Sequence, residues 1–320
     1  MGTILIFVCL FFIPDALTNT KEWTNFKEKF GKDYKSTLDE QRRFSIFQEN
    51  LKIIEAHNED YRNGKSTYYM GVNQFADMTQ EEFINRLGPA RNMDISGHSR
   101  IMDISTDDGN IPESIDWREI GAVTPVANQG ECGSCYIYGA LGSIESQHFL
   151  KSGKLINLSV QQILDCDEYN NGCIGGWPAS VYKQIRENGA VLSEDYQSYQ
   201  ENVGQCQANG TLFKGIGYLS VPRNENALKT AVATYGPVSV EIDASYLNKY
   251  SGGVYFNASC NANMANHVLL VVGYGTENGQ DYWLARNSWG TTFGIEGYVK
   301  MARNRNNNCA IANAPTLPIL

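Results

Sequence analysis

A cysteine stands at the start of a predicted helix, where its thiol is well placed for nucleophilic chemistry. The segment 128–136 reads NQGECGSCY, and the helix that begins at Cys135 is expected to run to about Lys151. The positive end of a helix and its free N–H groups stabilise a thiolate, which is the reactive form of cysteine. The sequence therefore indicates a nucleophile at Cys135.

A cysteine nucleophile needs a base, and only one of the four histidines suits this one. His57 and His98 lie between residues 19 and 110, a region without cysteine, and His148 lies 13 positions beyond Cys135 on the same helix. At the rise of an α-helix that is about 20 Å away. His267 remains, at the start of the apolar run HVLLVVGYG. We expect its ring to face Cys135 from a strand.

The elements that must position these two groups change in kind along the chain. The helix of Cys135 is followed by a second predicted helix over 159–166, with Ser159 as its N-cap. Four later segments rich in Val, Tyr and Ile are predicted strands: 237–243, 267–275, 281–290 and 297–303. Helices followed by strands predict an α+β fold with a cleft between the two parts, where ligands commonly bind.

The region before residue 110 is predicted to be a separate helical unit. Trp23, Phe26 and Phe30 recur at helical spacing, and a second apolar stripe runs from Phe44 to Ile54. Residues 88–110 are polar and aperiodic, as expected of a linker. Amphipathic helices need a surface to cover, and an exposed linker is open to cleavage. We therefore expect a removable segment that precedes a second unit over 111–320.

The first residues and the cysteine count point to the secretory pathway. An apolar stretch from Ile4 to Ile13 followed by small residues predicts a signal peptide over 1–18. Cys9 is removed with it, and seven of the eight cysteines remain. In an oxidising compartment six can form three disulfides, and the seventh is either a free thiol or an intermolecular bridge. Sequons begin at Asn157, Asn209 and Asn257.

Charge excludes some partners. The chain has 26 Lys and Arg against 35 Asp and Glu, a net charge of -9. Phosphate backbones require a basic surface, so nucleic acid is not an expected partner, and neither is an anionic membrane.

Taken together, these motifs resemble the papain family of cysteine peptidases, and within it the cathepsin L-like group. CGSCY is residues 132–136, His267 follows Cys135 by 132 positions, and Asn287, within NSWG, follows it by 152. The resemblance also covers Gln129, NGCIGG at 171–176 and CAIANA at 309–314. It implies a papain-like fold with a helical lobe, a β-barrel-like lobe and an active-site cleft between them.

The resemblance extends into the first segment. GVNQFAD matches the G-x-N-x-F-x-D motif of the family's propeptides through Gly71, Asn73, Phe75 and Asp77. The helical propeptide motif is matched by Asp39, Arg43, Phe47, Asn50, Ile54 and Asn58, with Asp39 where the family usually has Glu. The resemblance implies an inhibitory α-helical propeptide over 19–110 and a peptidase domain over 111–320.

The family also implies roles for the site residues. Cys135 attacks the peptide carbonyl, and His267 passes its proton to the leaving amine. Asn287 orients the imidazole, and the Gln129 amide with the Cys135 N–H stabilises the developing oxyanion. No metal or other cofactor is expected.

Substrate contacts and disulfides follow from the same resemblance. The implied substrate-binding residues are Gly133, Gly175, Gly176, Trp177, Pro178, Glu241, Asn266, Val268, Trp289 and Ala314. The implied disulfides are Cys132–Cys173, Cys166–Cys206 and Cys260–Cys309, which leave Cys135 free. Trp289 is expected to cover His267 and Asn287. Two interpretations of Glu241 stay open, a pocket residue that tolerates basic side chains and a solvent-facing strand residue.

The function implied is a secreted, lysosomal or endosomal endopeptidase that acts on polypeptides. Its expected partners are its own propeptide as an intramolecular inhibitor and cystatin-like inhibitors, and it is expected to be a monomer. One alternative is metal or thioredoxin-like chemistry at the single CxxC, and another is a catalytically silent homologue that acts as a binding protein. The second rests on departures beneath the site from the usual family residues: Tyr136, Tyr138, Gly139, Phe293 and Ala310.

Overall fold

The computed structural model describes residues 15–87, 91–92, 100–101, 111–207 and 210–320. Most of the predicted signal peptide and of the 88–110 linker lie outside these residues, as do His98 and the Asn209 sequon. The proposed boundaries at residues 18 and 110 therefore stay predictions.

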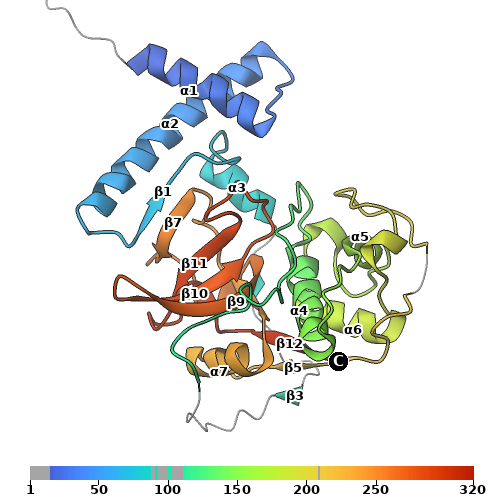
Figure 1. Cartoon of the computed structure of the whole chain (residues 1–320). Coiled ribbons are helices and arrows are strands. Elements are labelled where there is room, and N and C mark those ends of the chain that lie inside the picture. The colour runs from blue at the N-terminus through green and yellow to red at the C-terminus, as the bar shows by residue number, and fades with distance from the viewer. Residues whose placement is uncertain (1–14, 88–90, 93–99, 102–110, 208–209) are drawn as a thin grey trace, which may run out of the picture.

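The predicted propeptide contains the two helices expected from its apolar stripes. They are α1 (Asp15–Phe30) and α2 (Thr37–Arg62), followed by β1 (Tyr68–Met70) and α3 (Gln80–Leu87). The Ser36 side chain caps α2 by accepting a hydrogen bond from the Asp39 N–H. Trp23 packs against Phe26 and Phe47, and these rings form a small core of their own. Figure 1 shows α1 and α2 at one end of the molecule.

The helical lobe is built around the helix of Cys135. Its helices are α4 (Cys135–Ser152), α5 (Val160–Asp165) and α6 (Pro178–Asn188). One turn of 3-10 helix, Gly172–Ile174, lies between α5 and α6, and another, Ser193–Asp195, follows α6. Ser159 caps α5 as predicted, and Pro178 occupies the first turn of α6, where its missing N–H costs nothing. The apolar face of α4 packs on α6 and on strands of the second lobe.

The second lobe is a twisted sheet whose strands include the four predicted ones. These are β6 (Val238–Ile242), β9 (His267–Glu277), β10 (Gln280–Arg286) and β11 (Tyr298–Ala302). The remaining strands that the peptidase part gives to this sheet are β4 (Ile115–Asp116), β5 (Gly217–Ser220), β7 (Tyr250–Tyr255) and β12 (Thr316–Ile319). Strand β8 (Met264–Ala265) lies in a separate two-stranded sheet. Two short strands of the predicted linker, β2 (Arg91–Asn92) and β3 (Arg100–Ile101), pair with β8 and β5.

The order of strands joins the propeptide to the peptidase. Along the main sheet the order is β1-β7-β11-β10-β9-β6-β12-β5-β3, with β4 paired to β9. The first of these strands is in the predicted propeptide, and it pairs with β7 in antiparallel fashion. The propeptide therefore extends the sheet of the lobe that carries His267.

Two details of the second half differ from the sequence predictions. The strand predicted to run to residue 290 ends at Arg286, because Asn287 turns away and its N–H donates to the Gly297 carbonyl. A helix, α7 (Glu225–Tyr235), was not predicted there. It is capped by Asn224, whose side chain accepts a hydrogen bond from the Ala227 N–H. The division into helical and strand halves is thus correct except for α7.

Disulfides hold both lobes. The bonded pairs are Cys132–Cys173, Cys166–Cys206 and Cys260–Cys309, the same pairs that the family resemblance implied. Cys135 is a free, buried thiol. Among the described residues, no helix is long and apolar enough to cross a membrane, and no group of three or more His, Cys, Asp and Glu could hold a metal ion.

Candidate active site

Cys135 is the first residue of α4 and is 6% exposed. The turn before it is held from both sides. The Gly133 N–H donates to the Cys173 carbonyl at 2.8 Å, and a Cβ at this glycine would lie 2.6 Å from the same oxygen. Only glycine allows that close approach, so the thiol position depends on Gly133 and on the adjacent disulfide.

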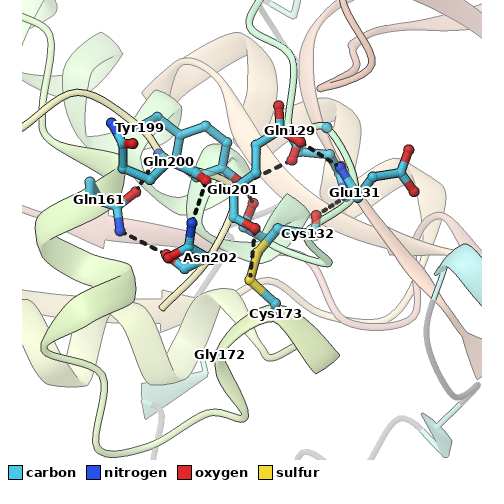
Figure 2. The surroundings of a disulfide bond; sticks show 12 residues. Gln129, Glu131, Cys132, Gln161, Gly172, Cys173, Tyr199, Gln200, Glu201 and Asn202 are labelled. Atoms are coloured by element: carbon cyan, nitrogen blue, oxygen red, sulfur yellow. Dashed lines mark hydrogen bonds between the residues drawn. A yellow bond between two sulfur atoms is a disulfide. The ribbon is translucent and has the colours of Figure 1, made fainter. Parts of the chain in front are cut away.

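A segment from the same lobe crosses over this disulfide (Figure 2). The backbone N–H of Glu131 donates to the Glu201 carboxylate at 2.9 Å, and Gln161 holds the segment by accepting from the Gln200 N–H at 2.8 Å. The Tyr199 hydroxyl donates to the Gln129 carbonyl at 2.9 Å and lies 2.6 Å from the Ser134 hydroxyl. These contacts fix the loop that carries Gln129 relative to the start of α4.

Gln129 is buried beside the thiol, and its side chain is held at both ends. Its amide nitrogen donates to the Cys132 carbonyl at 2.8 Å, and its amide oxygen accepts from the Ser288 hydroxyl at 2.7 Å. An amide nitrogen has two hydrogens, so one is still available to a substrate oxygen. These two hydrogen bonds fix the orientation of the amide.

His267 begins β9 on the opposite lobe. Its Nε2 lies 2.7 Å from Oδ1 of Asn287, and Trp289 stacks on the ring at a centroid distance of 4.5 Å. Because Asn287 Oδ1 also accepts from the Ser288 N–H, its orientation as an acceptor is fixed. Nε2 of His267 is therefore the donor, which leaves Nδ1 as the ring nitrogen for proton exchange. Both His267 and Cys135 line one cavity between the lobes.

In this closed form burial disfavours the charged form of both groups. Burial raises the pKa of the Cys135 thiol to about 12 and lowers the pKa of His267 to about 4. Desolvation acts here against the helix end, which favours a thiolate, because desolvation can shift a pKa by several units whereas a helix end contributes roughly 0.3–1 kcal/mol.

The cause of this burial is in part the N-terminal segment itself. Phe75 and Phe83 pack edge-on against the Trp289 ring at 5.3 and 5.6 Å, and Leu87 lines the cavity of Cys135. Gln74 donates to the Trp289 carbonyl at 2.6 Å. The segment covers both the histidine shield and the thiol.

The residues of the predicted propeptide motifs hold this cover together. Asn50 donates to the carbonyls of Ala76 and Met78, and Asn58 exchanges two hydrogen bonds with the backbone of Met70. Arg43 donates to the Asp77 carbonyl and to Glu82, with Asp39 at 4.0 Å. Phe47 and Ile54 are buried, and Gly71 donates its N–H to the Lys249 carbonyl of the peptidase.

A second part of the motif reaches the peptidase directly. The Asn73 side chain donates to the Asn248 carbonyl at 2.8 Å and accepts from the Phe75 N–H. Asp77 is almost fully buried and accepts from Lys32 and from Tyr34, each at 2.9 Å. The GVNQFAD segment therefore connects the propeptide helices to the peptidase.

The two sections of the chain match two known families. Residues 111–319 match the papain family of cysteine proteases, and residues 23–83 match the cathepsin propeptide inhibitor domain. This chain belongs to the papain family. A "Digestive cysteine proteinase 1" of Homarus americanus is 43% identical over 97% of this chain and 98% of its own length, and "Procathepsin L" of Rattus norvegicus is 40% identical over 95% and 93%. The solved structure of digestive procathepsin L2 proteinase from Tenebrio molitor larval midgut has a TM-score of 0.86 at 40% identity, covering 94% of this chain and 100% of that one.

The chain is thus a cysteine peptidase with a propeptide inhibitor domain, and residues of that domain cover the cleft in this structure. In papain-family terms, the cavity between the lobes is where substrate contacts are expected. It is lined by Leu87, Gly133, Cys135, Ile174, Gly175, Gly176, Trp177, Glu241, Ala265, Asn266, His267 and Val268, and its free volume is about 30 Å³. Trp289 covers His267, as anticipated.

Two anticipated pocket residues lie elsewhere in this form. Pro178 and Ala314 are buried, but neither lines the cavity, because Pro178 packs as the first residue of α6 and Ala314 precedes β12. Three lining residues, Leu87, Ile174 and Ala265, were not anticipated. Leu87 follows Phe83 by one helical turn on α3, a spacing visible in the sequence, but the sequence does not tell which surface this face covers.

The structure decides whether Glu241 faces the solvent. It lies on β6, in which all five residues are buried between neighbouring strands, and it is 4% exposed. The interpretation as a solvent-facing strand residue is wrong, because β6 is an interior strand with β9 on one side and β12 on the other.

The residues that differ from the usual family residues pack closely against their neighbours. Tyr136 is fully buried, and its hydroxyl donates to Asp167 at 3.0 Å. Phe293 packs edge-on against Trp289 at 4.7 Å. A Cβ at Gly139 would lie 2.6 Å from Cγ1 of Val268, so a glycine on α4 compensates for a valine on β9. None of these contacts disturbs the His267–Asn287 pair.

Proposed function

We propose that this chain is an autoinhibited zymogen of a cysteine endopeptidase that enters the secretory pathway and acts in an extracellular or lysosomal compartment. A signal peptide over 1–18 is removed first, and a propeptide over 19–110 is removed later to give a mature peptidase of residues 111–320. Relatives named digestive cysteine proteinases support an extracellular role in protein breakdown. The mature enzyme is expected to act as a monomer and to be inhibited by cystatin-like proteins.

The mechanism assigns one step to each group. Once the cleft is open to water, the Cys135 proton moves to His267, and the thiolate attacks the peptide carbonyl carbon. The carbonyl oxygen becomes negative and accepts from the Gln129 amide and the Cys135 N–H. His267 then protonates the amine as the C–N bond breaks, and it later takes a proton from the water that hydrolyses the thioester. Asn287 holds the imidazole throughout.

The observation that carries this proposal is the propeptide cover over a complete set of catalytic groups. Phe75, Phe83 and Leu87 lie over Trp289 and the Cys135 cavity, which is the arrangement needed by a chain whose activity must be suppressed until processing. A silent binding protein has no need of such a cover. The second candidate, a catalytically silent homologue, is disfavoured on this ground.

Acidification of the purified proenzyme, followed by titration with an epoxide thiol inhibitor, tests the proposal. We expect loss of the propeptide, one equivalent of inhibitor bound at Cys135 by peptide mapping, and internal cleavage of a denatured protein substrate. A Cys135→Ala proenzyme is the control and should neither process itself nor bind inhibitor. Wild-type protein that loses its propeptide but binds no inhibitor would favour the silent homologue, and a product mixture of only dipeptides or single residues would exclude endopeptidase activity.

A further inference from the structure

A buried carboxylate without a full set of partners lies next to the nucleophile. Glu241 is at the centre of β6, lines the same cavity as Cys135 and His267, and is 4% exposed. Its Oε2 atom is buried and has no hydrogen-bond partner among the described residues. Buried carboxylates are normally paired, because an unpaired one costs several kcal/mol. An oxygen left over at a ligand cavity points to a partner that arrives with the ligand.

The surroundings of Glu241 supply few charges. Of the elements packed against β6, α4 brings Cys135, β9 brings His267, and the turn before α7 brings Arg223, which is exposed to solvent. Strands β8 and β12 carry no ionisable side chain. Burial raises the pKa of Glu241 well above its usual value, and the charge of Arg223 only partly opposes this. In this closed form the carboxyl group therefore holds its proton more tightly than a free glutamate does.

In the zymogen, an apolar side chain of the propeptide lies at the cavity that Glu241 lines. Leu87 of the propeptide lines the cavity together with Glu241 and is itself 8% exposed. Its departure with the propeptide opens the space in front of the carboxyl group. A long side chain entering there lays its methylene stem on apolar walls such as Val268 and Ala265, and its polar end can reach Oε2.

We propose that Glu241 is a specificity-determining residue that gives this pocket two acceptable kinds of substrate side chain, an apolar one when its carboxyl group is protonated and a Lys or Arg side chain when it is ionised. The inference rests on the proposed peptidase function and names the substrate class that the pocket takes. A cationic side chain would supply the missing hydrogen bond and neutralise the charge, and charge-assisted bonds of this kind are the strong ones.

Ionised Glu241 also has a cost for catalysis that a bound cation removes. Its negative charge contributes to the raised pKa of Cys135, after the larger effect of burial. A positive side chain held beside Glu241 offsets that charge. Substrates with Lys or Arg in the pocket therefore neutralise the negative charge of Glu241, whereas apolar substrates do not.

By resemblance to the papain family, this pocket takes the substrate residue two positions before the cut. The test uses three fluorogenic peptide amides that differ only at that residue: leucine, arginine, or citrulline, which is the neutral isostere of arginine. They are assayed with enzyme matured at acid pH, from pH 4.5 to 7.5, with concentrations set by active-site titration. For the wild type, the ratio of kcat/KM for arginine over leucine should rise with pH, and arginine should exceed citrulline. Glu241→Gln should lower the arginine-to-leucine ratio about tenfold or more and make it independent of pH.

Two further variants separate the effect of the Glu241 charge from the effects of pocket volume and of the protein's net charge. Glu241→Ala enlarges the pocket without a carboxylate and should lose the preference for arginine over citrulline. Glu119→Gln removes one exposed carboxylate elsewhere and should leave all three ratios unchanged. A variant that does not process itself is matured by a trace of wild-type enzyme.

The outcomes also distinguish this inference from the proposed function. Citrulline cleaved as well as arginine, or an arginine-to-leucine ratio unchanged in Glu241→Gln, overturns the role of Glu241 and leaves the peptidase intact. Wild-type protein that cleaves none of the three peptides and binds no epoxide inhibitor overturns the proposed function itself.

Discussion

At the scale of single residues, the clearest strain is in the loop before the last strand. Ala310 has a φ of 67°, in the left-handed region that favours glycine, and it stands where the family usually has Gly. An L-residue with a Cβ pays roughly 1–2 kcal/mol for this conformation, whereas glycine adopts it freely. The chain therefore carries a local conformational cost at a buried position.

Ala310→Gly should stabilise the proenzyme by about 0.5–1 kcal/mol, since the relief of strain exceeds the extra entropy that glycine loses on folding. Urea unfolding of the Cys135→Ala proenzyme, which cannot digest itself, measures the change. Ala312→Gly is the matched control, because this neighbour is fully buried and does not have a positive φ, so glycine should destabilise there. Equal destabilisation at both positions would contradict the strain argument.

At the scale of elements, α4 approaches the sheet so closely that two of its positions admit no side chain. A Cβ at Gly139 would lie 2.6 Å from Val268, and one at Gly142 would lie 2.1 Å from a guanidinium nitrogen of Arg286. Arg286 in turn donates to the Thr124 carbonyl at 2.8 Å, and Thr124 donates to the buried Glu145 of α4. This packing sets the separation between Cys135 and His267.

Gly139→Ser should destabilise the protein by about 1–3 kcal/mol, because the new side chain overpacks against Val268. Val268→Ala makes room on the facing strand, so the double variant should be more stable than the sum of the two single changes indicates. Urea unfolding of all four proteins in a Cys135→Ala background measures the coupling. Strict additivity would show that the two positions do not compensate for each other.

At the scale of the whole molecule, the propeptide and the catalytic groups are linked through protonation. In the closed form burial holds the pKa of His267 at about 4, below the ordinary histidine value of 6.5. A lowered pKa means that the folded form prefers the neutral ring. Stability from this preference is complete above about pH 6.5, falls as the pH drops from 6.5 to about 4, and amounts to about 3 kcal/mol at most.

His267→Gln should therefore flatten the loss of stability between pH 6.5 and 4. The comparison is made between Cys135→Ala and Cys135→Ala/His267→Gln proenzymes, by urea unfolding at a series of pH values. Parallel curves for the two proteins would show that other groups dominate the acid sensitivity of the closed form.

Asp77 is a second candidate for control of opening. It is 3% exposed and ties the propeptide helices to the GVNQFAD run through its ion pair with Lys32 and its hydrogen bond from Tyr34. Asp77→Asn removes the charge, weakens both contacts and should let processing start at a higher pH. Propeptide loss followed by gel electrophoresis over pH 4 to 7 measures it, with Glu49→Gln on the exposed face of α2 as the control. An unchanged pH of processing would mean that Asp77 is not the trigger.

The sequence by itself determined the identity of the chemical groups. Cys135 and His267 were predicted from residue type and position in the chain, and Asn287 and Gln129 from the resemblance to the papain family, because short motifs such as CGSCY and NSWG can be read without knowledge of distant contacts. The propeptide helices and the strands were predictable for the same reason, since helical and strand periodicity is local. The helix α7 was not predicted, although its Asn224 cap is also a local signal.

Only the tertiary structure decided the environment of those groups. The pKa of Cys135 and His267 depends on burial, and burial depends on which face of α3 meets the cleft. Likewise, the sequence left Glu241 between a solvent-facing and a pocket position, and the order of strands placed it inside with one oxygen unpartnered. Desolvation and unsatisfied hydrogen bonds come from surfaces that are far apart in the chain, so they exist only once the lobes and the propeptide have come together.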